Sequence, residues 1–357
     1  MIKVLIVDDS AVVRRVLSDE LSKAADIHVV GTAVDPFVAR EKLLKLRPDV
    51  VTLDLEMPRM GGLAFLSKLM KYFPLPVVVV SSLTPQGSEA AMRALEAGAV
   101  DVVAKPAGSD ALPAISAMLV DRIRAAAAAR PARLQTVEAG TPKPPQPLTL
   151  SGLHNRLIAI GASTGGTDAI KRVLLGLPAN APATVVVQHM PAAFTAAFAK
   201  RLDQLCLMNV REALDGEPVE QGTALIAPGN RHMSVRRRGS GFVVQVKDGP
   251  MVHHQRPSVD VLFHSVAQQA GAAATGVILT GMGSDGAQGL LAMKEAGACT
   301  LAQDEASCVV FGMPKEAIAA GAVRTIAPVD QMANEILRSL AGGSGHAAEM
   351  TPIGNVP

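Results

Sequence analysis

Short apolar runs, each followed by a stretch with helical periodicity, repeat along most of the chain. In its first third, such runs predict strands at residues 4–7, 28–33, 50–53, 77–80 and 101–104. Between these runs, apolar residues recur at helical spacing, as Val12, Val16 and Leu17 do. Strands that alternate with helices predict a parallel, doubly wound sheet, whose functional groups collect at the carboxyl ends of the strands.

The same alternation returns after residue 153. Apolar runs predict strands at residues 157–162, 183–188, 224–227, 242–246, 275–280 and 299–302. Helical periodicity lies between several of them, at residues 193–205, 259–270 and 287–296. We therefore expect a second doubly wound α/β domain, again with a mainly parallel sheet.

The stretch from Arg130 to Thr149 separates the two halves. It carries five prolines between Pro131 and Pro147 and almost no large apolar residue, a composition typical of an extended linker. We predict a first domain at residues 1–122, a proline-rich linker at 123–152, a second domain at 153–341 and a disordered tail at 342–357.

Composition narrows the classes of function. Hydrophobic residues make up 49% of the chain and the net charge is +2, so we expect no affinity for nucleic acid and no membrane insertion. The absence of Trp, with one Tyr, argues against stacking surfaces for single-stranded nucleic acid. The three cysteines lack metal-ligand spacing, and the chain starts with a strand and not a signal peptide. We expect a cytoplasmic protein.

Polar residues with related chemistry follow the strands of the first domain: Asp8, Asp9, Asp54, Ser81 and Lys105. Clustered carboxylates repel one another unless a hard dication such as Mg²⁺ lies among them. Mg²⁺ also shields an incoming phosphoryl group, and the ammonium group of Lys105 is suited to contact the phosphoryl oxygens. Asp54 is then a candidate nucleophile for phosphoryl transfer.

This arrangement resembles the receiver domain of bacterial response regulators, a flavodoxin-like fold. The matching positions are Asp8-Asp9, Asp54-Leu55-Glu56-Met57-Pro58, Ser81 and Lys105-Pro106. The resemblance implies that Asp54 accepts a phosphoryl group from a histidine kinase, and that Asp8, Asp9, Asp54 and the carbonyl of Glu56 serve the Mg²⁺. Two positions depart from the family: Gly61 stands where an Asp is frequent, and Val102 where an aromatic is, so an aromatic rotamer switch is not expected.

In the second domain, the segment from Leu157 to Gly166 predicts a strand, a tight turn and the start of a helix. It places Ser163 at the carboxyl end of a strand, beside unpaired N–H groups able to stabilise an oxyanion. Gly161-Ala162-Ser163-Thr164-Gly165 also matches the G-x-S-x-G pattern of nucleophilic serines. A glycine-rich turn after a strand can equally bind a phosphate or let the chain bend.

Two more strand ends complete a candidate triad. The strand at 183–188 is followed by His189, and the strand at 275–280 opens into a glycine-rich loop containing Asp285. Ser163 would attack, His189 would take and return the proton, and Asp285 would orient the imidazole. The order Ser, His, Asp along the chain differs from that of α/β-hydrolases, so the pattern around Ser163 does not assign that fold.

Structural roles for these polar residues are alternatives to catalytic ones. His189 could be a core histidine, and Asp285 could be a turn residue, with Ser284 as a rival nucleophile that lacks a partner. The pair His253-His254 is adjacent and not spaced i, i+4, a spacing that does not favour a metal site. The remaining polar positions are interpreted as structural, rim or solvated hairpin residues: His232, His264 and Arg236-Arg237-Arg238.

The second domain resembles the catalytic domain of bacterial chemotaxis protein-glutamate methylesterases, which follows a receiver domain in that family. The motifs that carry the resemblance are Gly161-Ala162-Ser163-Thr164-Gly165-Gly166, Gln188-His189-Met190, Ala227-Pro228-Gly229, Arg256-Pro257-Ser258-Val259-Asp260 and Gly281-Met282-Gly283-Ser284-Asp285-Gly286. The resemblance implies a Rossmann-like esterase domain with the triad Ser163, His189 and Asp285, and an oxyanion site formed by Thr164, Met282 and Gly283.

It further implies hydrolysis of glutamyl γ-methyl esters, and deamidation of glutamines, on methyl-accepting chemotaxis receptors. No cofactor is expected for the ester chemistry, and the unphosphorylated receiver is expected to cover the catalytic crevice. Three other classes of protein fit the sequence less well. A DNA-binding regulator lacks a basic helical output domain, a dinucleotide oxidoreductase lacks G-x-G spacing, and a non-catalytic scaffold requires that the three triad residues do not meet.

Overall fold

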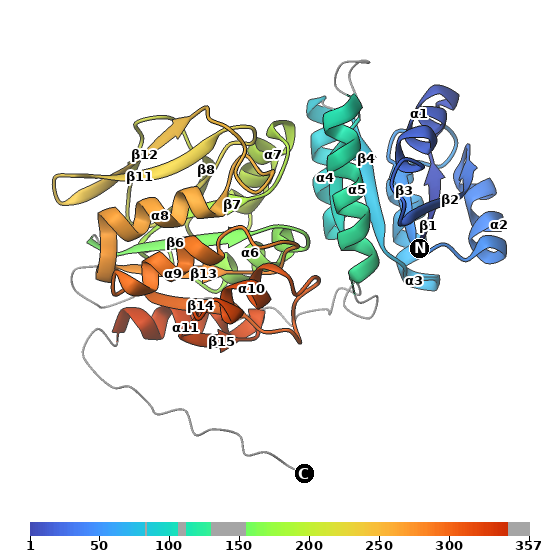
Figure 1. The fold of residues 1–357 in the computed structure, drawn as a ribbon. Helices are drawn as coiled ribbons and strands as arrows, with labels where there is room; N and C mark the ends of the chain where they lie inside the picture. Colours follow the sequence, from blue (N-terminus) through green and yellow to red (C-terminus); the bar gives the residue numbers. More distant parts are fainter. Residues whose placement is uncertain (83, 106–111, 130–154, 342–357) are drawn as a thin grey trace, which may run out of the picture.

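The computed structural model describes residues 1–82, 84–105, 112–129 and 155–341 (Figure 1). Of the predicted linker at 123–152, residues 130–152 lie outside these residues, as does the predicted tail, and residues 123–128 belong to a helix. Two α/β units stand side by side, with helices α4 and α5 of the first unit turned towards the second.

The first unit is a five-stranded parallel sheet with the strand order β2-β1-β3-β4-β5. Its inner strands are almost fully buried runs rich in Val, Leu and Ile, as expected where helices cover both faces. The strands are β1 Ile2–Val7, β2 Ile27–Ala33, β3 Val50–Asp54, β4 Val77–Ser81 and β5 Asp101–Ala104. The helices are α1 Ala11–Leu21, α2 Pro36–Leu46, α3 Gly62–Tyr72, α4 Pro85–Glu96 and α5 Leu112–Ala128.

The second unit is built on a seven-stranded parallel sheet with the order β15-β14-β13-β6-β7-β10-β8. The strands are β6 Leu157–Ala162, β7 Ala183–Gln188, β8 Asn209–Glu212, β10 Thr223–Ile226, β13 Ala274–Ile278, β14 Cys299–Gln303 and β15 Thr325–Ala327. The helical elements are α6 Gly166–Leu175, α7 Ala192–Asp203, α8 Val259–Ala270, η4 Gly271–Ala273, α9 Ala287–Glu295, α10 Met313–Ala319 and α11 Val329–Ala341. The prediction of two doubly wound α/β domains is confirmed.

The strand predicted at 242–246 belongs to a separate antiparallel sheet. In this sheet β12, Gly241–Lys247, pairs with β11, His232–Arg238, and with β9, Pro218–Val219. Gly239 adopts a φ of 60° in the turn between β11 and β12, which closes the hairpin. The hairpin predicted at Arg236-Arg237-Arg238 is confirmed, although apolar patterning did not mark the start of β11 as a strand.

Helices cover the large sheet on both faces. Helices α6, α7 and α11 pack on one face, and α8, α9 and α10 pack on the other together with the antiparallel sheet. The first apolar cluster is continuous with the core of the first unit, because α4 packs on α7. The order of the strands reverses between β13 and β6, and sites of open α/β sheets lie at such a point.

Candidate active site

The three predicted triad residues lie together at the carboxyl edge of the large sheet. Ser163 follows β6, His189 follows β7, and Asp285 lies in the loop after β13, and these three strands are neighbours. His189 Nε2 lies 2.8 Å from Asp285 Oδ2. All three residues are at most 3% exposed. The fold therefore joins His189 to Asp285 and places Ser163 at the end of the neighbouring strand. Within the described ranges, Ser163 Oγ is bonded to Arg122 and not to His189.

The turn at Ser163 is fixed by its own backbone. Ser163 N–H donates to Thr280 O at 3.0 Å, and the carbonyl of Ser163 accepts from Gly166 N at 2.7 Å and from Gln188 Nε2 at 2.9 Å. Gly165 adopts a φ of 77°, and a Cβ there would lie 2.5 Å from Val309 Cβ, so the position requires glycine. Ser163 is thus held immediately before the N-terminus of α6.

Asp285 accepts four hydrogen bonds through its carboxylate. Besides His189, the donors are the hydroxyl of Ser258 at 2.8 Å, Val259 N at 2.7 Å and Asp260 N at 3.0 Å. Burial alone raises the pKa of this carboxyl, but the bonds and charge of His189 and the two amides outweigh it, so the pKa is lowered. Asp285 therefore stays ionised beside the imidazole.

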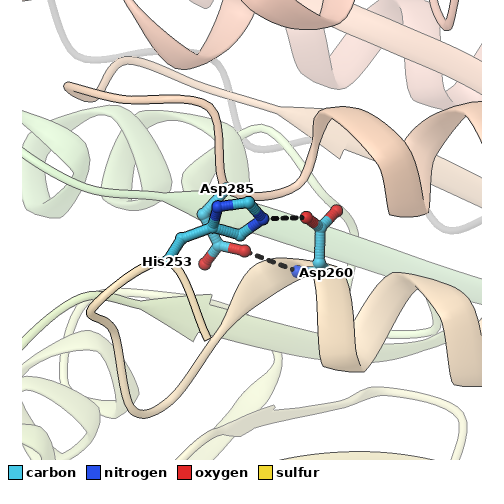
Figure 2. Close-up of side chains that lie close together, drawn as sticks. All are labelled: His253, Asp260 and Asp285. Atoms are coloured by element: carbon cyan, nitrogen blue, oxygen red, sulfur yellow. Dashed lines mark hydrogen bonds and ion pairs between the residues drawn. The ribbon is translucent and has the colours of Figure 1, made fainter. Parts of the chain in front are cut away.

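The close grouping of His253, Asp260 and Asp285 is occupied by hydrogen bonds and not arranged as a metal site (Figure 2). His253 Nε2 lies 3.0 Å from Asp260 Oδ2, and Asp260 Oδ1 accepts from Gly289 N at 2.6 Å. Each oxygen of Asp285 already accepts two hydrogen bonds. A cation here would have to displace bonds that hold the candidate triad.

The hydrogen bond to Asp285 assigns the tautomer of His189. An ionised carboxylate only accepts, so Nε2 carries a proton in either charge state of the ring, and in the neutral imidazole the lone pair lies on Nδ1. Nδ1 is buried and has no hydrogen-bond partner among the described residues. The nitrogen available as a general base is therefore Nδ1, which faces away from Asp285 on the imidazole ring.

The hydroxyl of Ser163 is engaged by an arginine of the first unit. From α5, Arg122 Nη1 donates to Ser163 Oγ at 2.9 Å and to Thr164 Oγ1 at 3.2 Å, while its Nη2 donates to His189 O at 3.1 Å. Asp101 of β5 forms an ion pair with Arg122 at 3.1 Å and accepts from Thr164 Oγ1 at 2.8 Å. Sequence reasoning missed Arg122 and Asp101, because nothing in either segment indicates a partner in another domain.

Two backbone N–H groups near Ser163 are candidates for stabilising an oxyanion. Within the described ranges, the N–H groups of Thr164 and Met282 donate no hydrogen bond, whereas Ser163 N is already used. The loop of Met282 is anchored on both sides of Gly281, whose N–H donates to Val310 O and whose carbonyl accepts from Met313 N. Gly283 follows with a φ of 91°, which gives this loop its tight path. The role of these groups stays a prediction.

The predicted phosphoacceptor site is assembled in the first unit. Lys105 Nζ lies 2.7 Å from Asp54 Oδ2 and 3.1 Å from Asp8 Oδ2, and carboxylate oxygens of Asp8, Asp9 and Asp54 lie within 4.8 Å of one another. Burial raises the pKa of Asp8, partly offset by Lys105. Three carboxylates thus face one ammonium group, an excess of negative charge that fits a hard dication. The carbonyl of Glu56 is the predicted ligand of the Mg²⁺. The side chain of Glu56 accepts a hydrogen bond from the hydroxyl of Ser82.

Within the described ranges, Ser284, Arg237 and His232 form no hydrogen bond with Ser163. Ser284 is exposed. Arg237 lies over the ring of Phe242 at 5.1 Å and bonds to Gln269, which are contacts within the hairpin and with α8. His232 is buried, and its role is discussed below. No helix in the described part of the chain is long and apolar enough to cross a membrane.

Comparison with known proteins agrees with this geometry. The family model described as CheB methylesterase matches residues 158–336, and the model described as response regulator receiver domain matches residues 4–116. The chain belongs to the CheB methylesterase family. A protein named protein-glutamate methylesterase/protein-glutamine glutaminase 2, from Syntrophus aciditrophicus, is 58% identical over 94% of this chain and 98% of its own length.

Further relatives extend the comparison to other bacteria and to a solved structure. The protein-glutamate methylesterase/protein-glutamine glutaminase of Escherichia coli K12 is 52% identical over 96% of this chain and 98% of its own length. The crystal structure of the Thermotoga maritima CheB methylesterase catalytic domain matches with a TM-score of 0.50 and 35% identity, covering 51% of this chain and 97% of that one. The fold and the receiver-plus-esterase architecture of this family member are thereby established.

Proposed function

We propose that this protein is a cytoplasmic protein-glutamate methylesterase that hydrolyses glutamyl γ-methyl esters on methyl-accepting chemotaxis receptors. Deamidation of receptor glutamines at the same site is the second activity, as in the names of its relatives. The observation that carries the proposal is the buried His189–Asp285 hydrogen bond beside Ser163, in a chain that aligns with named methylesterases over nearly its whole length.

In the proposed reaction, Ser163 Oγ attacks the ester carbonyl while His189 Nδ1 takes its proton. Asp285 stabilises the resulting imidazolium, and the N–H groups of Thr164 and Met282, with the Gly283 loop, hold the oxyanion. His189 returns the proton to the departing methoxide, so methanol leaves and an acyl-enzyme remains. Water, activated by His189, releases free glutamate. An amide follows the same course, with a harder leaving group that needs the same proton.

The closed arrangement of the two units is the basis of the proposed regulation. A receptor helix cannot reach Ser163 while Arg122 contacts it and α5 covers the crevice. Phosphoryl transfer from a chemotaxis histidine kinase to Asp54 is proposed to favour an open arrangement. Bound Mg²⁺ would offset the repulsion between the negative phosphoryl group on Asp54 and the carboxylates of Asp8 and Asp9.

The start of α4 offers a route from Asp54 to the domain interface. Ser81 Oγ donates to Gly87 O at 3.1 Å in the first turn of α4. The next residue, Ser88, donates to Ala193 O of α7 at 2.9 Å. If the hydroxyl of Ser81 turns to a phosphoryl group on Asp54, it releases Gly87 and loosens the contact that Ser88 makes.

Methanol release from methyl-labelled receptor membranes tests the proposal. We expect release that rises with a small-molecule phosphodonor and Mg²⁺, that is abolished in Ser163→Ala, and that does not respond to phosphodonor in Asp54→Ala. Release that persists in Ser163→Ala would overturn the triad. Phosphorylation of Asp54 without any methanol release would favour a non-catalytic output domain or a different acyl substrate.

A further inference from the structure

The segment Arg256-Pro257-Ser258-Val259-Asp260 has no part in the reaction described so far. It forms the start of α8, a helix that packs between the large sheet and the antiparallel sheet. Ser258 is the N-cap residue, and its hydroxyl accepts from Val261 N at 3.4 Å. Ser258 is fully buried, so its hydroxyl acts inside the protein and not towards solvent.

The start of α8 points at Asp285. Ser258 Oγ donates to Asp285 Oδ1 at 2.8 Å, Val259 N donates to Oδ2 at 2.7 Å, and Asp260 N donates to Oδ1 at 3.0 Å. The bond from His189 Nε2 to Oδ2 completes the set. Donors from α8 on both oxygens fix the plane of the carboxylate, so that Oδ2 keeps facing the imidazole.

We propose that Ser258 is a positioning residue of the esterase reaction, because its hydroxyl and the first N–H groups of α8 hold Asp285 in the orientation that His189 requires. The assignment rests on the function proposed above. Ser258 does not touch the reacting atoms. Its contribution appears only when the imidazole becomes charged, because a misplaced carboxylate stabilises the imidazolium less well.

A buried histidine supports Ser258 from behind. Ser258 N–H donates to His232 Nδ1 at 3.2 Å, and His232 Nε2 donates to Pro250 O at 2.8 Å. His232 lies on β11, so this pair of bonds ties the start of α8 to the antiparallel sheet. The antiparallel sheet therefore helps to hold the start of α8 beside Asp285, although none of its residues is in the proposed triad.

The peptide dipoles at the start of α8 act in the same direction as the hydroxyl. A helix N-terminus favours a negative charge, and Asp285 lies within bonding distance of its first two N–H groups. The hydroxyl of Ser258 adds a donor to Oδ1, which would otherwise accept only from Asp260 N. Among the donors to Asp285, Ser258 and His189 are the ones that use side chains, so Ser258 can be removed by mutation without altering the backbone atoms.

The test uses the full chain, activated with phosphodonor and Mg²⁺, and measures methanol release over a range of substrate concentration and pH. In Ser258→Ala we expect kcat to fall about 10- to 100-fold while KM changes little. We also expect the acid limb of the pH profile of kcat/KM to move to lower pH, because Asp285 stabilises the protonated His189 less well. Loss of stability alone would lower the amount of active protein without moving this limb.

Ser265→Ala is the matched control. Ser265 also lies on α8 and joins it to β11, since its hydroxyl accepts from Val235 N at 2.8 Å, but it does not contact Asp285. We expect wild-type kcat and an unmoved acid limb in Ser265→Ala, and recovery of kcat in Ser258→Thr, which keeps a hydroxyl donor. Should Ser258→Ala not fold, Ser258→Cys keeps the size of the side chain and weakens the donor.

Two results would overturn the proposal while the wild type is active: equal kcat in the folded Ser258 variants and the wild type, or a fall in kcat without a shift of the acid limb. A wild-type chain that releases no methanol would instead count against the proposed function itself. Phosphorylation of Asp54, followed in parallel, shows that the chain tested is folded and responsive.

Discussion

Arg122 Nη1 lies 2.9 Å from Ser163 Oγ, so an arginine of the first unit holds the hydroxyl of the proposed nucleophile in the second unit. The same guanidinium group is paired with Asp101 of its own domain, and both side chains are at least nine-tenths buried. The closed arrangement thus does more than cover the site, because it also occupies the serine hydroxyl while His189 Nδ1 has no partner among the described residues.

Replacement of Arg122 by Ala should activate the enzyme without a phosphodonor. Across the interface, the Arg122 guanidinium group donates to the hydroxyls of Ser163 and Thr164 and to the carbonyl of His189. A hydrogen bond from a charged group contributes about 1.5–3 kcal/mol, and each 1.4 kcal/mol is a factor of ten in the equilibrium. We expect basal methanol release to rise about tenfold or more, with a smaller response to phosphodonor. Arg124→Ala, on the same helix but paired with the exposed Asp26, should behave as wild type. Unchanged basal release in Arg122→Ala would contradict the inhibitory role.

Ser88→Ala should weaken the interface more modestly. The hydroxyl of Ser88 lies 2.9 Å from Ala193 O across the interface and 3.0 Å from Thr84 O of its own helix start, so the two carbonyls share one donor. A neutral hydrogen bond contributes about 0.5–1.5 kcal/mol. Basal release should therefore rise by a few-fold and by less than in Arg122→Ala. Ser67→Ala, which removes a bond within α3, serves as the control. A larger effect of Ser88→Ala than of Arg122→Ala would show that α4, and not α5, dominates the closed arrangement.

The lowered pKa of Asp285 predicts how a variant responds to pH. Burial raises this pKa, but the contacts from His189 and α8 outweigh it, so the stabilisation is present above the ordinary value of 3.8 and is lost as pH falls through the lowered pKa. Asp285→Asn should lose about 1–3 kcal/mol of stability near neutral pH. Calorimetry from pH 7 downwards should show this deficit narrowing only below pH 3.8. A deficit that vanishes already at pH 5 would contradict the pKa direction.

The thiol of Cys206 should be inert in the folded protein. Burial, together with the charge of Asp203, raises the pKa of this thiol to about 12. At pH 8 only on the order of one molecule in ten thousand carries the thiolate. Mass spectrometry should detect little alkylation of Cys206 by iodoacetamide in the native chain and full alkylation in urea. Rapid native labelling of Cys206 would show that its surroundings are more open.

The sequence predicted that the three proposed triad residues lie at one edge of the large sheet, because each follows a strand that apolar patterning marks. To predict the positions of Ser163, His189 and Asp285, it was enough to know that the carboxyl ends of parallel strands meet at one edge of a sheet. Arg122 was beyond this reasoning, since its contacts join segments whose meeting depends on how two domains dock. Likewise, Ser258 lies in a motif that family resemblance marks, but its role depends on the direction in which α8 points.

For the small sheet, the sequence predicted β12 and the hairpin at its start but not the full length of β11. The strand β11 combines buried Met233 and Val235 with a charged end, so its period is clear over too few residues to predict a strand. The boundaries of the two domains and the roles of the oxyanion groups stay predictions, because neither follows from the position of a single side chain.

The apolar contact between α4 and α7 gives the closed arrangement a temperature dependence. Separation of the domains would expose part of an apolar cluster that now runs through both of them, and exposure of apolar surface to water raises the heat capacity. Apolar association weakens on cooling. The proposed inhibition by the receiver should therefore weaken in the cold, and a larger fraction of unphosphorylated molecules should be open. Because chemical steps are slowest in the cold, this larger open fraction would partly buffer the rate of demethylation against temperature.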